Sequence, residues 1–163
     1  RSKLDELRSQ ADIVIDSSNL NVHQLEKRIA EIFSPGSLSA IRINVLSFGF
    51  KYGIPVDSDM VADLRFLPNP YWDPNLKDLT GLDAAVNDHV VANPDAQDFL
   101  TKYAQLFELV SEGYVREGKR FVTIAMGCTG GKHRSVAMVE NLSARLVKSG
   151  VEVRVVHRDL GRE

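Results

Sequence analysis

The beginning of the chain contains one short apolar run and one pattern with helical spacing. Residues 11–16 (ADIVID) predict a buried strand that ends at a polar turn. Asn21 can then cap a helix, with Gln24 three residues later as its capping-box partner. One apolar face of that helix is predicted from Leu25, Ile29, Ile32 and Phe33. The breaker sequence at residues 34–37 (SPGS) predicts the end of the helix and a domain boundary.

Two strand-like runs and a proline-rich loop come next. Residues 41–48 (IRINVLSF) and residues 60–67 read as strands, and a glycine-containing loop at residues 49–55 separates them. Residues 68–74 (PNPYWDP) contain three prolines, which exclude a helix there. The alternation of apolar runs with turn residues is typical of a sheet-containing domain.

From here to the end of the chain, helices and strands alternate. The pattern predicts a short helix near residues 82–91, a long helix that starts at residues 93–95, a strand at 120–126, a helix at 135–148 and a strand at 151–156. Gly150 is positioned to stop the penultimate element. This order predicts an α/β fold with a mostly parallel sheet flanked by helices.

The segment between the strand at 120–126 and the helix at 135–148 is the strongest candidate site. It contains Cys128, Thr129, Gly130, Gly131, Lys132, His133, Arg134 and Ser135. A strand-to-helix turn aims unpaired backbone N–H groups and the positive end of a helix dipole at one point. Two glycines let the backbone bend and let a ligand approach closely, while the cations add charge. The loop therefore predicts an anion site, best suited to a phosphate group.

Topology is expected to bring further residues to this loop. A strand–helix–strand crossover is parallel in nearly all cases, and ligands of open α/β sheets bind outside the carboxyl ends of the strands. His157 and Arg158, which follow the last strand, should therefore lie near the loop. Lys51 and the Tyr71-Trp72 loop join them if the earlier strands run the same way.

The loop also matches two other phosphate-binding patterns in part. It is not a Walker A loop, because three residues separate Gly127 from Gly131 where that motif has four. The spacing of Cys128, Gly131, Arg134 and Ser135 does fit the C-x-x-G-x-x-R-S pattern of cysteine phosphatases, in which a thiolate attacks phosphorus. Asp73 would then be the acid, which leaves a phosphatase as the alternative to a binding site.

Composition narrows the function classes. The chain has 163 residues, of which 44% are hydrophobic and 26% are charged, and its formal net charge is -2. Such a balance is typical of a globular protein and excludes a general polyanion binder, so an RNA contact needs a local basic patch. Candidates for that patch are Lys119, Arg120, Lys132, Arg134, Arg154, Arg158 and Arg162.

The remaining sequence signals concern compartment and extent. A single cysteine excludes an internal disulfide and predicts a cytoplasmic location, and no apolar run approaches the length of a membrane span. No grouping of His, Cys, Asp and Glu has the spacing of a metal site. The chain begins with Arg1 and without a signal peptide, and we expect it to be a piece of a longer protein.

Several segments together resemble the RapZ/YvcJ family of bacterial nucleotide-binding proteins, also called RNase adapter proteins. The resemblance is carried by residues 47–55 (SFGFKYGIP), 65–74 (RFLPNPYWDP), 79–83 (LTGLD), 127–135 (GCTGGKHRS) and 157–158 (HR). It implies an N-terminal P-loop domain that binds and hydrolyses ATP or GTP, and a C-terminal domain with a phosphofructokinase-like fold. Residues 37–163 resemble that C-terminal domain, and residues 1–36 resemble the end of the P-loop domain with its linker.

The resemblance also implies ligands and partners. Enterobacterial members of the family sense glucosamine-6-phosphate, bind small regulatory RNA and contact an endoribonuclease. The matching ligand positions are Cys128, Thr129, Gly130 and Arg134, while Tyr71 stands where those members carry a histidine. Secondary ligand contacts are expected from Lys51, Arg65, Tyr71, His157 and Arg158. The resemblance implies no catalytic residue and no cofactor in this chain, and a homo-oligomer is expected.

Overall fold

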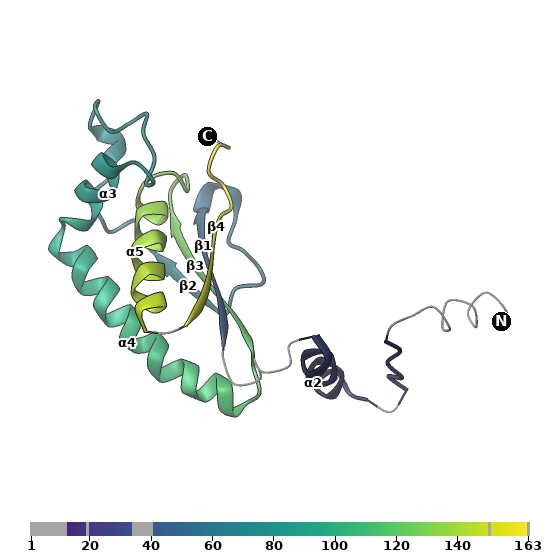
Figure 1. The fold of residues 1–163 in the computed structure, drawn as a ribbon. Helices are drawn as coiled ribbons and strands as arrows, with labels where there is room; N and C mark the ends of the chain where they lie inside the picture. Colours follow the sequence, from purple (N-terminus) through teal and green to yellow (C-terminus); the bar gives the residue numbers. More distant parts are fainter. Residues whose placement is uncertain (1–12, 19, 34–40, 150, 163) are drawn as a thin grey trace. The chain divides into compact units, whose positions relative to one another are not determined.

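The fold is described from a computed structural model, which covers residues 13–18, 20–33, 41–149 and 151–162 (Figure 1). The chain divides into two compact units, Arg1–Ser39 and Ala40–Glu163. The assignment of residues 1–36 to a P-loop domain stays a prediction.

The first unit contains helix α2 (Val22–Phe33). Its N-terminus has the predicted capping box: Asn21 N–H donates to Gln24 Oε1 and Gln24 N–H donates to Asn21 Oδ1, both at 2.9 Å. The helix ends at Phe33, directly before the breaker sequence, whose residues lie outside the described part of the chain.

The strand predicted at residues 11–16 is wrong for its described part. Residues 13–16 have no strand structure, and the side chains of Ile13 and Val14 are 44% and 50% exposed. An apolar run becomes a buried strand only beside another strand, and the described residues of this unit contain none. Residues 11 and 12 lie outside the described residues.

The second unit contains a four-stranded sheet of β1 (Arg42–Gly49), β2 (Met60–Asp63), β3 (Phe121–Cys128) and β4 (Glu152–His157). The strand order is β2-β3-β1-β4, and every pair is parallel. The predicted fold class, an α/β fold with a parallel sheet, is confirmed. The crossover from β3 to β4 is also parallel, as predicted.

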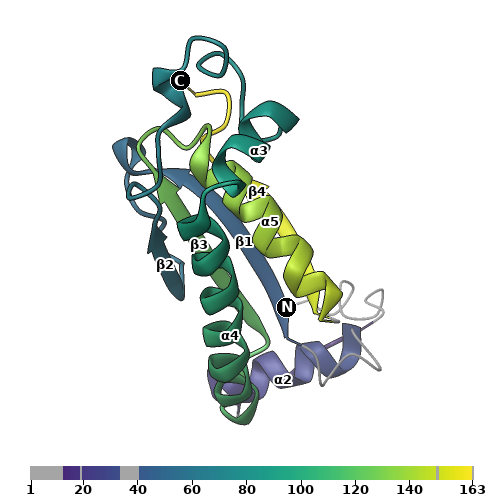
Figure 2. The same ribbon diagram turned by 90° about the vertical axis from the view of Figure 1, so that its left-hand side faces the viewer.

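Two helices, α4 (Pro94–Arg116) and α5 (Arg134–Lys148), cover one face of this sheet, and α3 (Ala84–Val91) packs against α5 (Figures 1 and 2). Helix α4 begins as predicted, since Asn93 Oδ1 accepts from Asp95 N–H at 2.8 Å. The core lies between this helical layer and the sheet, where Ile43 of β1 and Val122 of β3 are buried in one cluster with Leu142 of α5. Burial of that apolar surface is the main force that holds the layers together.

The strand predicted at residues 60–67 is too long, because β2 ends at Asp63. Asp63 Oδ1 accepts a hydrogen bond from Arg65 N–H at 2.9 Å, and Leu67 N–H donates to the carbonyl of Leu64 at 3.2 Å. The carboxylate thus starts a turn that directs the chain away from the sheet. Gly150, expected to stop α5, lies outside the described residues.

The register of the sheet places the candidate loop. Gly49, at the end of β1, pairs with Cys128 at the end of β3, and Ser47 pairs with His157 at the end of β4. The short 3-10 helix η1 (Phe50–Tyr52) directly follows β1. All of these ends meet at one edge of the sheet. Among the described residues, no helix is long and apolar enough to cross a membrane.

Candidate functional site

The candidate loop connects the carboxyl end of β3 to the N-terminus of α5. The chain bends through residues 129–133, and α5 begins at Arg134. Gly131 has a φ of 82°, in the left-handed region that side chains other than glycine rarely adopt. The strand-to-helix turn predicted here is therefore present, with the first turn of a 15-residue helix facing the loop.

A close approach of two backbones holds the loop against β1. A Cβ atom on Gly49 would lie 2.5 Å from the carbonyl carbon of Gly130, and one on Gly131 would lie 2.7 Å from Gly49 N. A side chain fits at neither position without movement of the backbone. Sequence reasoning assigned Gly131 to the bend but gave no such role to Gly49. Only the pairing of β1 with β3 shows that Gly49 lies against the loop.

Cys128 lies under the loop, with 3% of its surface exposed. Its Sγ accepts a hydrogen bond from Gly131 N–H at 3.2 Å and lies 3.2 Å from Ser135 Oγ, which is fully buried. These contacts join the end of β3, the bend and the first turn of α5. Cys128 and Ser135 thus brace the loop from beneath.

Arg134 is buried as well, with 5% of its surface exposed. Its Nη1 donates to the carbonyls of Arg65 and Leu67, at 3.1 and 3.0 Å, and its Nη2 donates to Thr129 Oγ1 at 3.3 Å. Burial lowers the pKa of Arg134, although the nearby Cys128 and Asp63 oppose this shift. The guanidinium is therefore a clamp between the loop and the turn after β2.

Two lysines flank the loop at its surface. Lys51 is exposed, its N–H donates to the carbonyl of Thr129 at 3.2 Å, and a Cβ atom on Gly130 would lie 3.8 Å from Lys51 Nζ. Lys132 is half-buried, and its Nζ lies 3.3 Å from the carbonyl oxygen of Lys77. Lys51, which the sequence placed near the loop, therefore does lie beside Gly130.

His133 and Tyr71 are connected through Lys77. His133 occupies the N-cap position of α5 without a side-chain capping hydrogen bond, is buried, and has its Nε2 3.1 Å from the carbonyl oxygen of Lys77. The ammonium of Lys77 lies 5.4 Å from the centre of the Tyr71 ring, and Tyr71 packs edge-on against Trp72. The Tyr71 side chain is 47% exposed, so the proline-rich loop presents an aromatic surface beside the candidate site.

Arg65 lies at the same edge but is held by its neighbours. Its guanidinium forms an ion pair with Asp63 at 2.7 Å and lies 4.2 Å from the centre of the Phe50 ring. The hydrogen bond from Arg65 holds the pKa of Asp63 below its usual range. The carbonyl of Arg65 therefore accepts a hydrogen bond from Arg134, while its guanidinium lies at the surface and is neutralised by Asp63.

His157 and Arg158 follow β4, as predicted, but their side chains contact protein groups. His157 Nδ1 lies 2.8 Å from Ser47 Oγ, and its Nε2 lies 3.0 Å from Glu140 Oε1 on α5. Arg158 donates to Asp159 and, at 2.7 Å, to the carbonyl of Gly53. The end of β4 instead reaches the loop through Asp159, whose Cβ lies 3.1 Å from a Cβ placed on Gly131.

Asp159 is a residue that sequence reasoning missed. It is fully buried, accepts from Gly49 N–H at 2.8 Å, and forms ion pairs with Arg158 and Arg162. Burial alone raises the pKa of this carboxyl, but the hydrogen bonds from Arg158 and Gly49 and the positive charges outweigh it and lower the pKa. The signal in the sequence for this role was an acidic residue directly after His157 and Arg158.

We expect Asp159→Ala to lower the free energy of unfolding at neutral pH by roughly 1–2 kcal/mol, because solvent screens the two arginines in part. Since the folded-state pKa is depressed, this contribution is present above the ordinary carboxyl pKa of about 3.9 and is lost as the pH falls through the folded-state value. Urea unfolding from neutral to acid pH measures both stabilities. If the difference in the free energy of unfolding between Asp159→Ala and the unchanged chain stays constant into acid, the charge network is contradicted.

Gly81 is a third residue, after Gly49 and Asp159, that the sequence did not assign to the loop. Its N–H donates to the carbonyl of Lys132 at 2.9 Å, and an added Cβ would clash with the His133 carbonyl and Ala137 N. The segment before α3 thus packs directly onto the first turn of α5. The glycine in the sequence Leu79-Thr80-Gly81 was the only signal for this contact.

The two described grooves lie away from the loop. One, of about 430 Å³, lies under residues 54–58 on the sheet face that the helices leave open, and Arg158 lines it. The other, of about 420 Å³, lies beside α4. Residues 127–135 line neither groove, so the candidate site rests on the loop geometry and its cations.

Comparison with known proteins agrees with this architecture. The family described as the RapZ C-terminal domain matches residues 41–161. Similar proteins include nucleotide-binding proteins from Nocardioides sp., 60% identical, from Frankia alni, 57% identical, and from Streptomyces coelicolor, 56% identical, each over 163 residues. The match covers 100% of this chain and 54%, 56% and 54% of those three relatives, respectively, so the chain spans about half of their length.

The second unit is a parallel α/β domain with a glycine-containing loop at the carboxyl edge of its sheet. The family model matches nearly the whole of this unit. The chain belongs to the family of RapZ C-terminal domains, and the resemblance in the sequence is confirmed.

Proposed function

We propose that this chain is the ligand-sensing part of a regulatory RapZ-type nucleotide-binding protein, and that the loop formed by residues 128–135 is the binding site for the phosphate group of a small molecule. The ligand is a phosphosugar such as glucosamine-6-phosphate, or a nucleotide. The observation that carries the proposal is the position of Lys51 beside Gly130: in the loop that precedes α5, a Cβ placed on Gly130 would meet only the end of the Lys51 side chain, at 3.8 Å.

Three physical features support phosphate binding there. The first turn of α5 supplies the positive end of a helix dipole. Thr129 is exposed and Gly130 is half-exposed, so a ligand can reach the backbone. Lys51 and Lys132 add two positive charges that make no ion pair with a described carboxylate. Arg134 and Asp159 act differently in this proposal, because they hold the loop in shape from beneath.

We expect Lys51→Ala to weaken binding of glucosamine-6-phosphate by about tenfold, because a charged contact to phosphate is lost. The fold should be unchanged, since Lys51 is exposed. Lys148→Ala is the matched control, because that lysine is an exposed residue at the opposite end of α5. Titration calorimetry measures the affinities. Equal affinities for Lys51→Ala and Lys148→Ala would remove Lys51 from the site.

A cysteine phosphatase is the second candidate, favoured by the N–H of Gly131 and the hydroxyl of Ser135 at Cys128 Sγ. Three observations weigh against it. The sulfur is buried, Arg134 is engaged by two carbonyls, and Asp73 Oδ1 accepts from Asn75 N–H within its own turn. These groups hold local structure and are not arranged around an open nucleophile.

We therefore expect no hydrolysis of p-nitrophenyl phosphate or sugar phosphates above background, and less than about a tenfold change in ligand affinity in Cys128→Ser. Phosphate release and calorimetry measure these quantities. Steady turnover that disappears in Cys128→Ser and drops in Asp73→Asn would establish the phosphatase in place of the sensor.

The family resemblance extends the proposal to the whole protein. ATP or GTP would bind to a P-loop domain whose end is residues 1–36. Small RNA and an endoribonuclease are the proposed macromolecular partners, in a cytoplasmic homo-oligomer. An RNA contact would use the cations of the loop edge, and its affinity would fall as salt rises.

A further inference from the structure

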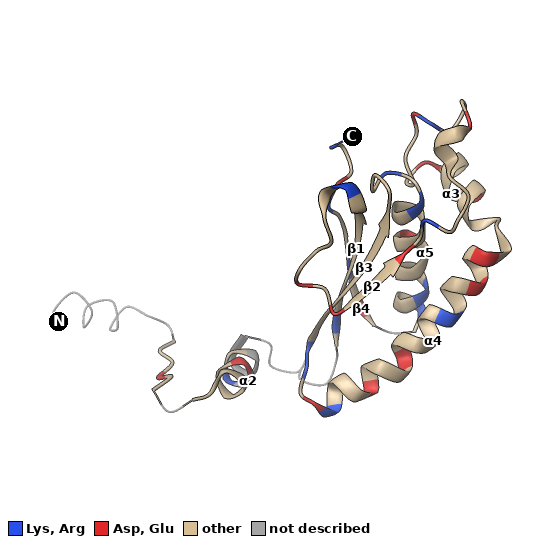
Figure 3. Cartoon of the chain, turned by 180° about the vertical axis from the view of Figure 1, so that it is seen from behind, with Lys and Arg blue, Asp and Glu red and all other residues tan. Residues whose placement is uncertain are grey.

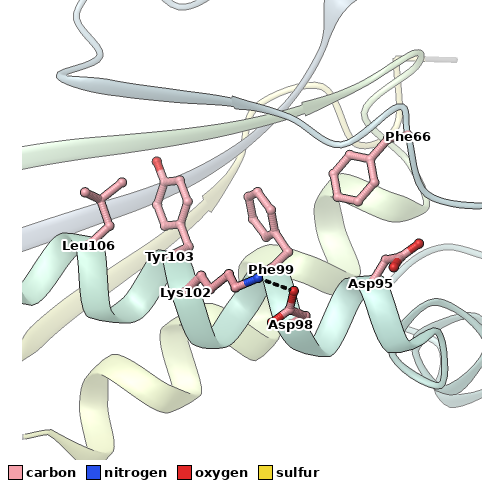
Figure 4. Close-up of a pocket in the computed structure, with 7 residues that line it drawn as sticks. All are labelled: Phe66, Asp95, Asp98, Phe99, Lys102, Tyr103 and Leu106. Atoms are coloured by element: carbon pink, nitrogen blue, oxygen red, sulfur yellow. Dashed lines mark hydrogen bonds and ion pairs between the residues drawn. The ribbon is translucent and has the colours of Figure 1, made fainter.

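A groove of about 420 Å³ runs along α4, apart from the candidate loop (Figure 4). Its apolar wall consists of Phe66, from the turn after β2, and Phe99, Tyr103 and Leu106, from α4. In Figure 4 these α4 side chains point to the same side of the helix, toward the segment that carries Phe66. The spacing of the α4 positions, three or four residues apart, produces one continuous stripe.

The aromatic rings form a row that is only partly covered. The ring centres of Phe66 and Phe99 are 5.7 Å apart, and those of Phe99 and Tyr103 are 5.2 Å apart. Phe66 is 54% exposed and Leu106 is 46% exposed. Clustered aromatic and aliphatic side chains at a surface groove are typical of protein-binding sites.

One aromatic residue of the wall also carries an unsatisfied polar atom. Tyr103 is 9% exposed, and its buried hydroxyl has no hydrogen-bond partner among the described residues. Burial, followed by the effect of Tyr114, raises the pKa of Tyr103 to about 12, so the hydroxyl stays protonated and neutral. Because that oxygen is covered, the groove presents the ring of Tyr103, and not its hydroxyl, to an occupant.

The rim of the groove determines the charge of the occupant. Asp95 and Asp98 line it, and Lys102 is held by Asp98 at 2.6 Å. Asp95 has no ion-pair partner in the described part of the chain. Along its length α4 carries four carboxylates (Asp95, Asp98, Glu108 and Glu112) and two cations, Lys102 and Arg116. Figure 3 shows these acidic positions along α4.

This charge disfavours a nucleic acid or a phosphorylated ligand, which would be repelled by the carboxylates. It favours a protein segment with Lys or Arg beside apolar side chains. We propose that the α4 groove is a docking site for such a basic, apolar-anchored peptide segment of a partner protein. This surface is separate from the phosphate site, and the proposal stands without it.

A peptide selection tests the docking site. A random peptide library displayed on phage is selected against the chain and counter-selected against a double variant, Phe66→Ser with Leu106→Ser. Both side chains are about half exposed, so the variant should fold, which circular dichroism and urea unfolding check. Leu109→Ser is the matched control, since Leu109 is 70% exposed on α4 but does not line the groove.

We expect the recovered peptides to combine Lys or Arg with aromatic or aliphatic residues. Their affinity, measured by fluorescence anisotropy, should fall at least about tenfold in the double variant and in Asp95→Lys, and stay unchanged in Leu109→Ser. Three results would overturn the proposal. These are a selection that yields no groove-dependent peptide, recovered peptides that are acidic, and self-association of the chain that the double variant abolishes, which would identify a second copy as the occupant.

Discussion

Gly49→Ala should unfold or severely destabilise the second unit, with a loss of roughly 2–4 kcal/mol in the free energy of unfolding. The added Cβ would lie 2.5 Å from the Gly130 carbonyl carbon and 2.6 Å from its oxygen, and both are backbone atoms that cannot rotate away. Either β1 or the loop must move. We therefore also expect phosphate binding to be lost wherever the variant still folds.

Gly113→Ala is the matched control for this substitution. Gly113 lies within α4, and a Cβ there would meet only Arg116 Nη2, at 3.7 Å. The same chemical change should therefore raise stability by up to about 1 kcal/mol, because alanine favours helix. Urea unfolding of both variants measures the contrast. A Gly49→Ala chain as stable as the unchanged chain would show that β1 and the loop are not in close contact.

Arg134→Ala should lower the free energy of unfolding by roughly 2–4 kcal/mol, because it removes charged hydrogen bonds to two carbonyls and leaves a cavity. The pattern of the loop alone suggests a ligand contact whose loss spares the fold. The structure assigns a different consequence: the carbonyls of Arg65 and Leu67 lose their donor, and the turn that carries Phe66 is released.

Arg134→Lys separates the clamp from the charge. Lysine retains a positive charge but cannot donate to both carbonyls and to Thr129 in one plane. In urea unfolding, we expect the free energy of unfolding of this variant to lie between those of Arg134→Ala and the unchanged chain. An Arg134→Ala chain of unchanged stability and reduced phosphate affinity would contradict the clamp and restore Arg134 as a direct ligand contact.

Local signals predicted much of the fold and the conformation of the candidate loop. The loop, the start of α5 and the capped helices follow from glycine, capping residues and apolar spacing, which act within a few residues. Lys51 was placed correctly at the loop because parallel strands end at one edge. The run at residues 11–16 misled because its pattern cannot show whether a partner strand exists.

The remaining features depend on contacts between distant segments. Asp159 meets Gly49 across 110 residues, and Arg134 reaches Leu67 across 67. No periodicity encodes such pairs, and a buried arginine and a surface arginine look alike in a sequence. The length of β2 was overestimated for a related reason: the carboxylate of Asp63 starts a turn, which apolar spacing does not reveal.

The most direct test of the central claim is a calorimetric titration of the chain and of Gly130→Ala with glucosamine-6-phosphate and with glucosamine. A Cβ on Gly130 meets only the Lys51 side chain, at 3.8 Å, so the variant should fold normally while its methyl group fills the space beside the ammonium. We predict binding of the phosphorylated sugar alone, weakened at least about tenfold by Gly130→Ala. Equal binding of both sugars, or an affinity that Gly130→Ala leaves unchanged, would contradict a phosphate site at this loop.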